Sequence, residues 1–141
     1  MKLTYSPPDV IGIISHGMSR ETVRKIVNRP YREFQKSDDD ENTSDHFVEE
    51  GVQVYYFADN TVDGVEVYSP SQVEFNGTEF LARPIGSVLR EMAQSGEPVE
   101  MQLWGATAVS GNLRIGVTGF EDGGGDAKIS SVCIYLTWPG S

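Results

Sequence analysis

The sequence contains one cysteine, no long apolar run and, between residues 37 and 82, neither lysine nor arginine. Cys133 alone cannot form an internal disulfide, and a chain without disulfides fits a reducing compartment. No apolar stretch approaches the roughly 20 residues that cross a bilayer. The opening MKLTYSPPDVIGII also lacks the long apolar stretch of a signal peptide. We therefore expect a cytoplasmic protein that has no membrane partner.

The missing basic residues make the charge of the chain uneven. Residues 1–36 carry a net charge of +4, residues 37–82 carry twelve acids and a net charge of −12, and residues 83–141 carry −2. Such a field repels nucleic acid and anionic membranes, and it attracts a cationic partner. The alternative interpretation, that the acids serve only solubility, stays open.

The rest of the composition is that of a folded protein. The chain has 141 residues, of which 38% are apolar, and 14 of its side chains are aromatic. This length suits a single domain over residues 1–141 with a core of its own.

The first half is predicted to contain one short helix followed by strands. Ser19 is a suitable N-cap, Val23, Ile26 and Val27 form one apolar face, and Pro30 ends the helix. β-rich segments follow at 31–36, 46–57 and 65–70, separated by a polar loop at 37–45 that cannot bury anything and by a turn at 58–64. Short connections favour antiparallel pairing of these strands.

The second half repeats this order. A hairpin around Asn76-Gly77 is predicted over 73–82, and Pro84 suits the first position of a helix that ends at Gly96. Strands are predicted at 99–105, 112–119 and 128–138, with a loop at 121–126. The fold class is therefore α+β, with two tandem units, 1–70 and 71–138. Each unit is a helix plus three antiparallel strands, and together they form one compact body.

A short motif marks the first helix. It consists of Gly17, Met18, Ser19, Val23 and Pro30, followed by Tyr55 and Phe57 in a strand position. The motif resembles the Gly-Met-Thr/Ser-x-x-x-Val helix start of the β-lactamase inhibitory protein family, which has tandem helix–helix–three-strand repeats. It is also similar to that of BamE-type outer-membrane assembly lipoproteins, which have one such unit, and to that of some proteins resembling toxin-immunity proteins.

The resemblance is confined to the first half of the chain. The second half has no Gly-Met-Ser start, and no lipidation cysteine lies near the beginning of the sequence. The resemblance implies a scaffold that binds other proteins through a sheet and loops, without catalysis. The motif also has a purely architectural explanation, since Gly17 allows a tight turn and Met18 can pack before the helix.

Few residues suggest catalytic or metal chemistry. His16 and His46 are the only histidines, and we expect His46 to be solvated at a strand start. Cys133 has no histidine near it in sequence, and we expect it to be buried as a small apolar residue. The acidic runs at 38–41 and 121–126 do not match a calcium-binding loop, and no phosphate-binding loop is present. We therefore predict no enzyme activity, no metal and no cofactor.

The acids and their aromatic neighbours predict a protein-binding surface. We expect a non-enzymatic inhibitor or immunity protein that neutralises a basic, toxin-like partner. The predicted partner-binding residues are Asp38, Asp39, Asp40, Glu41, Asp45, Glu49, Glu50, Tyr55, Asp59 and Asp63. Aromatic anchors could come from Phe47, Tyr55, Tyr56, Phe57 and Tyr68. Two alternatives stay open. One is a small-molecule-binding or catalytic domain with Trp104, Tyr135 or Trp138 in a cleft, and the other is an accessory subunit of a larger assembly.

Overall fold

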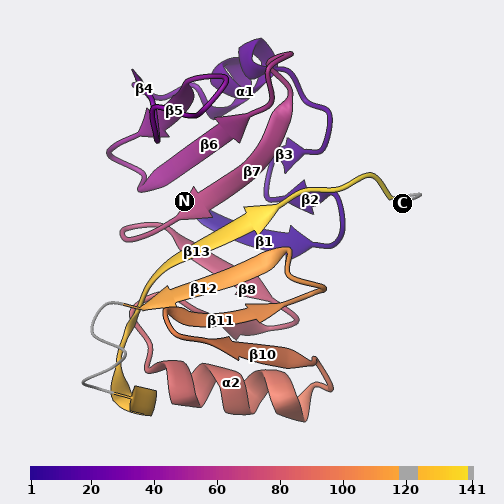
Figure 1. Ribbon diagram of the computed structural model, residues 1–141, viewed down its shortest axis with the longest axis vertical. Coiled ribbons are helices and arrows are strands. Elements are labelled where there is room, and N and C mark those ends of the chain that lie inside the picture. Colours follow the sequence, from indigo (N-terminus) through magenta and orange to yellow (C-terminus); the bar gives the residue numbers. More distant parts are fainter. Residues whose placement is uncertain (118–123, 140–141) are drawn as a thin grey trace.

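The computed structural model describes residues 1–117 and 124–139, and its largest feature is an antiparallel sheet of eight strands (Figure 1). In spatial order the strands are β10 (Val99–Gln102), β11 (Gly105–Ala108), β12 (Leu113–Val117), β13 (Ile129–Tyr135), β7 (Val62–Val67), β6 (Val52–Tyr56), β5 (Ser44–Phe47) and β4 (Arg32–Phe34). Figure 1 shows this sheet running along the long axis of the molecule, from β4 near α1 to β10 near α2. The predicted α+β class and the single compact body are confirmed.

A second, smaller sheet has five short strands. In spatial order they are β3 (Ile14–Ser15), β2 (Val10–Ile11), β1 (Lys2–Ser6), β8 (Gln72–Phe75) and β9 (Thr78–Glu79). The hairpin predicted around Asn76-Gly77 is confirmed as β8–β9, and both turn residues have positive φ. The strands β1 to β3 were not predicted. Of these three strands, β2 pairs with β1 and with β3, its neighbours in the sequence, whereas β1 also pairs in parallel with the distant β8, with Lys2 opposite Gln72.

The first helix, α1 (Arg20–Val27), forms as predicted. The hydroxyl oxygen of Ser19 accepts a 3.1 Å hydrogen bond from the amide of Thr22, and Asn28 ends the helix in the left-handed conformation. Val23 and Val27 are buried, but Ile26 is exposed and so does not belong to the buried face. Arg20 takes part in that face instead, because a buried carboxylate lies opposite it.

The second helix, α2 (Ile85–Gln94), buries Ile85, Val88 and Met92. Pro84 does not occupy the first helical position as predicted. It is the N-cap residue, because its ψ of 130° is extended rather than helical. Gly96, with φ of 82°, follows the end of the helix as expected.

The beginning of each helix is tied to the last strand of its half in the same way. Two backbone hydrogen bonds of 2.8 to 3.0 Å form each connection. As donor and acceptor they are Val62–Met18 and Arg20–Asn60 in the first half, and Ile129–Arg83 and Ile85–Ala127 in the second. The two connections therefore have the same pattern, and their residues are 65 or 67 positions apart.

Four strands follow each helix, whereas three were predicted. The segment 46–57 is broken by a turn at 48–51 into β5 and β6, and β11 was not expected. The strands predicted at 31–36, 99–105 and 128–138 are found as β4, β10 and β13, each three or four residues shorter than predicted. The strand predicted at 65–70 is β7, which begins three residues earlier, at Val62, within the turn predicted at 58–64. Residues 118 and 119 of one predicted strand and 121–123 of the predicted loop lie outside the described residues. Gly124–Asp126 forms a 3-10 turn.

One apolar cluster joins both helices and both sheets. Val65 and Val67 of β7 belong to it, as do Val132 and Ile134 of the adjacent strand β13. Side chains alternate along a strand, so their neighbours point to the opposite face of the eight-stranded sheet. Neither described helix combines the length and apolar character needed to span a membrane.

Candidate functional site: the open face of the large sheet

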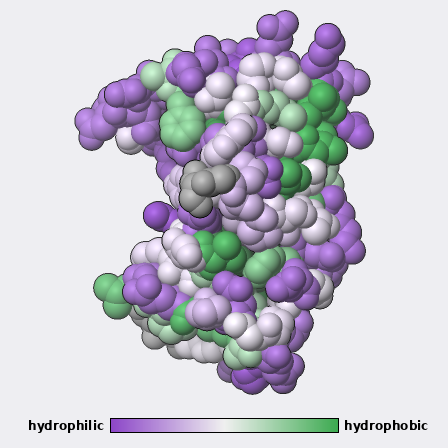
Figure 2. Space-filling model, turned by 90° about the vertical axis from the view of Figure 1, so that its right-hand side faces the viewer, coloured by the Kyte–Doolittle hydropathy of each residue, from purple (hydrophilic) through white to green (hydrophobic). Residues whose placement is uncertain are grey.

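The face of the eight-stranded sheet that points away from the core forms the candidate site. Two rows of opposed residues cross its centre. One row places Tyr55 of β6 and Tyr135 of β13 on either side of Gly64 in β7, and the other runs Gln53, Glu66, Cys133 and Arg114. Figure 2, in which the side facing the viewer of Figure 1 lies at the left, shows the outline hollowed midway along the long axis.

Gly64 allows the two tyrosines to lie beside each other on this face. A Cβ at this position would lie 2.9 Å from Cδ1 of Tyr135 and 3.0 Å from the carbonyl oxygen of Ile134. Both distances are below ordinary van der Waals contact. The absence of a side chain at Gly64 therefore gives the Tyr135 ring its place over β7.

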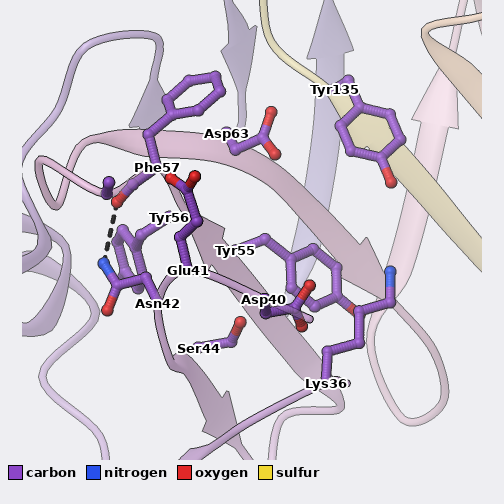
Figure 3. Close-up of a pocket in the computed structure, with 11 residues that line it drawn as sticks. Lys36, Asp40, Glu41, Asn42, Ser44, Tyr55, Tyr56, Phe57, Asp63 and Tyr135 are labelled. Atoms are coloured by element: carbon purple, nitrogen blue, oxygen red, sulfur yellow. Dashed lines mark hydrogen bonds between the residues drawn. The ribbon is translucent and has the colours of Figure 1, made fainter. Parts of the chain in front are cut away.

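A cavity of about 260 Å³ opens at one end of this face (Figure 3). We define the acidic loop as residues 35–43, between β4 and β5. The loop forms one wall, the end of β6 and the start of β7 form another, and Tyr135 of β13 closes the third side. The lining residues are Lys36, Asp40, Glu41, Asn42, Ser44, Tyr55, Tyr56, Phe57, Ala58, Asp63 and Tyr135.

Side-chain hydrogen bonds hold the acidic loop in place. Nδ2 of Asn42 donates a 2.9 Å bond to the carbonyl oxygen of Phe57, shown dashed in Figure 3. Oδ1 of Asn42 accepts from the guanidinium of Arg20 at 3.2 Å. The amide of Ser37 donates to the carboxylate of Asp40 at 2.8 Å. The wall of the cavity is therefore anchored to both α1 and β6.

Lys36 lies within this cavity above an aromatic ring. Its ammonium nitrogen is 4.3 Å from the centroid of the Tyr55 ring, a distance typical of cation–π contact. The Tyr55 hydroxyl donates its proton to the carboxylate of Glu66, and Oε1 of Gln53 is a second acceptor 2.8 Å from the hydroxyl oxygen. Burial and the Glu66 carboxylate together raise the pKa of Tyr55, so the phenol stays neutral beneath the cation.

The charge around the cavity is negative. The carboxylates of Asp40, Glu41 and Asp63 line it, and Lys36 is the only basic residue among the described residues of its lining. Partial burial raises the pKa of Asp63, although the charge of Lys36 counteracts this. Within residues 1–117 and 124–139 the Asp63 carboxylate has neither a hydrogen-bond donor nor an ion-pair partner. The cavity is therefore suited to a positively charged group.

A second cavity of about 280 Å³ adjoins the first and shares Lys36 and Tyr135 with it. Its other lining residues include Trp104, Arg114 and Cys133. The Arg114 guanidinium lies 5.0 Å from the centroid of the Tyr135 ring. Burial and the nearby Glu66 carboxylate raise the pKa of the Cys133 thiol to about 11, so it is a poor nucleophile at neutral pH. The two cavities together form one groove across the open face.

The predicted partner-binding residues fall into three places. Seven of them lie at the end of the sheet that holds the first cavity: Asp38, Asp39, Asp40, Glu41, Tyr55, Asp59 and Asp63. Glu49 and Glu50 lie in the β5–β6 turn, which is at the opposite end of an antiparallel sheet. Most of the Glu50 side chain is buried near Arg29. The structure thus separates these two acids from the cavity.

Asp45, the remaining predicted residue, lies in the interior. Its side chain is 0% exposed and bonds to Arg20, Arg24 and Tyr56. The prediction that residues 37–45 bury nothing is therefore wrong at Asp45 and at the neighbouring Ser44, which belong to β5. The physical reason is the two arginines of α1, which compensate the buried charge.

The aromatic side chains near the acids divide between core and surface. Phe47 and Tyr56 are buried, whereas Phe57 at the rim of the first cavity is 47% exposed. Tyr135 and Lys36 were not among the predicted partner-binding residues. Tyr135 lies 80 positions after Tyr55, its neighbour across Gly64, and only the pairing of β13 with β7 brings them together. No local sequence pattern identifies such a contact.

Trp104 and Tyr135, two of the three residues proposed for a cleft, do line the second cavity. Trp138, the third, lies elsewhere, with its ring 5.5 Å from that of His16. The prediction that His46 is solvated is wrong. Its ring is half-buried between Phe34 and Tyr68, and its Nε2 forms a hydrogen bond with the Tyr68 hydroxyl. Burial and the positive charge of Arg32 lower its pKa. No group of three or more potential metal ligands occurs among the described residues.

A larger cavity of about 610 Å³ lies against the β10–β11 hairpin. Among the described residues that line it, none is aromatic or basic. Its Glu97 carboxylate is already used, since it accepts a 3.0 Å hydrogen bond from the amide of Val109. The described lining of this cavity therefore lacks the aromatic rings and the basic residues that the groove on the open face contains.

Comparison of this chain with protein-family models, curated proteins and solved structures found no match.

Proposed function

We propose that the protein is a non-enzymatic binding protein that inhibits or neutralises a basic protein partner, as an immunity protein does with a toxin. The partner would contact the open face of the large sheet at the end formed by the acidic loop. The observation that carries this proposal is the combination of an uncovered groove, an aromatic floor and carboxylates that form no ion pair with any described residue.

The charge distribution supports a basic partner. Several acids of the segment 37–82 are paired internally, with Asp45 bound to two arginines and Glu74 and Glu79 bound to Lys2. Glu41 and Asp63, which have no ion-pair partner among the described residues, line the first cavity, and the exposed Asp38 and Asp39 lie beside them in the acidic loop. Their combined field would accelerate association with a cationic surface and discriminate against acidic proteins.

Each cavity of the groove has a size that suits one side chain of a protein partner. The two cavities of the groove measure about 260 and 280 Å³, below the range of roughly 300–1,000 Å³ typical of small-molecule sites. Cavities of this size suit single side chains that project from a protein surface. Exposed Phe57 at the rim can supply an apolar contact beside the charged groups.

We also infer that the chain consists of two tandem units, 1–70 and 71–138. The matching backbone connections of α1 and α2, which are offset by 65 or 67 positions, support this inference. So does the order of the large sheet, in which β4 to β7 and β10 to β13 meet at the central pair β7–β13. The groove crosses this central pair, so both units contribute residues to it.

The test is capture of the partner from host lysate, followed by titration of the purified partner. Substitution of the acidic loop in the variant D38N/D39N/D40N/E41Q should weaken binding and reduce its dependence on salt. The matched control also removes four exposed acids, outside the groove: E21Q/E49Q/E100Q/D126N. If both variants bind equally, or if the captured protein is acidic, the proposal is wrong.

A further inference from the structure

We propose that the first cavity is the subsite for one arginine side chain of the partner, whose guanidinium takes the place now held by the ammonium group of Lys36. This inference rests on the proposed function, because it specifies which chemical group of a basic partner the open face receives. It commits to a guanidinium, and lysine is treated below as a competing ligand.

The chain itself places a cation in the cavity. The Lys36 ammonium lies 4.3 Å from the centroid of the Tyr55 ring, so the ring face is already used to hold a positive charge. Lys36 is exposed, and within the described residues its ammonium has no carboxylate within ion-pair distance. A flexible side chain held by one aromatic contact can leave at little cost. Lys36 therefore contacts the Tyr55 ring but leaves the surrounding carboxylates without an ion-pair partner among the described residues.

The carboxylates that Lys36 leaves unpaired surround the same space. Asp63 extends from β7 on one side, and Asp40 and Glu41 extend from the acidic loop on the other (Figure 3). Asp63 is half-buried and has no donor among the described residues. Burial raises its pKa, and a cationic partner would lower the pKa again and recover that electrostatic cost. The carboxylates thus lie around the cation on the Tyr55 ring without forming an ion pair with it.

The shape of the site favours a guanidinium over an ammonium. A guanidinium is planar and can stack on the Tyr55 ring while its five N–H donors reach acceptors on both sides. A guanidinium is also more weakly hydrated than an ammonium, so it loses less hydration free energy when it enters a partly buried site. Lys36 illustrates the limit of an ammonium here, since it contacts the ring but pairs with none of the described carboxylates.

The experiment uses small probes, so it does not require the partner to be identified. N-acetyl-arginine amide, N-acetyl-lysine amide and N-acetyl-citrulline amide are titrated into ¹⁵N-labelled full-length protein at constant ionic strength. Citrulline has the shape of arginine without its charge. Backbone amide shifts of Lys36, Asp63 and Tyr135 are followed, with those of Glu49 as an internal reference. We expect saturable shifts with the arginine probe, weaker binding of the lysine probe and none of the citrulline probe.

Two pairs of variants locate the binding. K36M should strengthen binding of the arginine probe roughly twofold to tenfold, because the competing cation is gone. R32Q removes a positive charge from the neighbouring exposed strand position and should change affinity less than K36M does. D63N should weaken binding at least about threefold, whereas E49Q, at the opposite end of the sheet, should leave it unchanged.

Several outcomes would overturn the inference. If the citrulline probe binds as tightly as the arginine probe, the site does not recognise positive charge. If the lysine probe binds as tightly as the arginine probe, the site does not select a guanidinium over an ammonium. Equal effects of K36M and R32Q would reduce the result to general electrostatics. If a basic partner is captured but the arginine probe does not bind, the subsite is wrong while the proposed function stands. If the probe binds as expected but no partner is captured, the proposed function fails instead.

Discussion

Arg24 and Asp45 form a two-point ion pair inside the molecule. Nε of Arg24 donates to Oδ2 of Asp45 and Nη2 donates to Oδ1, both at 2.8 Å. Arg20 and the Tyr56 hydroxyl add bonds of 3.2 and 3.0 Å to the same carboxylate. Because Arg20 also bonds to Asn42, this network links α1 to the acidic loop that borders the candidate site.

Substitution of Asp45 by asparagine should strongly destabilise the protein. Two guanidinium groups would then lack their buried counter-charge, and breaking such a pair typically costs about 3 to 5 kcal/mol. Glu33 provides the control, since it pairs with the same Arg24 but is 53% exposed, and E33Q should cost less than about 1 kcal/mol. Urea unfolding of both variants measures the difference. Similar losses would contradict the interior role of Asp45.

The contribution of Asp45 should disappear at acid pH. Burial alone raises the pKa of Asp45, but hydrogen bonds from Arg24, Arg20 and Tyr56 outweigh it and hold the pKa below its usual value. The stabilisation is then present above the unfolded pKa of about 3.9 and is lost as the pH falls through the lower folded pKa. The difference in unfolding free energy between wild type and D45N should therefore narrow below about pH 4. A difference that is constant from pH 7 to pH 3 would refute this.

Replacement of Gly64 by alanine should displace Tyr135. The added methyl group would lie too close to both the Tyr135 ring and the Ile134 carbonyl oxygen, and overpacking of this kind typically costs about 1 to 3 kcal/mol. Gly116 lies on the same face, but there the nearest atom, 2.9 Å away, is the rotatable hydroxyl of Ser131. G116A should therefore be tolerated better. Thermal unfolding measures the loss of stability in each variant, and near-ultraviolet circular dichroism detects the displacement of the tyrosine ring.

Phe57 should contribute to partner binding and little to stability. It is 47% exposed at the rim of the first cavity, so F57A should weaken affinity by about 1 to 3 kcal/mol if it is an anchor. Trp138, 62% exposed, contacts His16 and is not in the lining of the groove, so W138A serves as the control. Titration calorimetry with the captured partner measures both. A larger loss for W138A would move the binding surface away from the groove.

Cys133 should react slowly with thiol reagents in the native protein. With a pKa of about 11, it carries roughly 100-fold less thiolate at neutral pH than a cysteine at the ordinary value of 9.0. Reaction with Ellman's reagent should accelerate on unfolding in urea, and C133S should show no reaction. Fast labelling of the folded protein would indicate an activated thiol and would reopen an enzymatic role.

The sequence by itself determined the local elements and the imbalance of charge. Ser19 caps α1 and the Asn76-Gly77 turn forms β8–β9, because these structures depend on residues a few positions apart. The α+β class follows from the same local patterns. Two acids of the groove, Asp40 and Glu41, were also visible as part of a run in the sequence, since the acidic loop is one continuous segment.

Only the tertiary structure decided which of these residues form a site. Asp45 and Asp40 lie in the same acidic run, yet Asp45 is buried because two arginines of α1 lie opposite it, while Asp40 lines the cavity. Tyr135 joins Lys36 and Tyr55 because β13 pairs with β7, a contact between distant segments that no local periodicity encodes. Burial and long-range strand pairing depend on the whole chain, and so the groove could be recognised only from the folded protein.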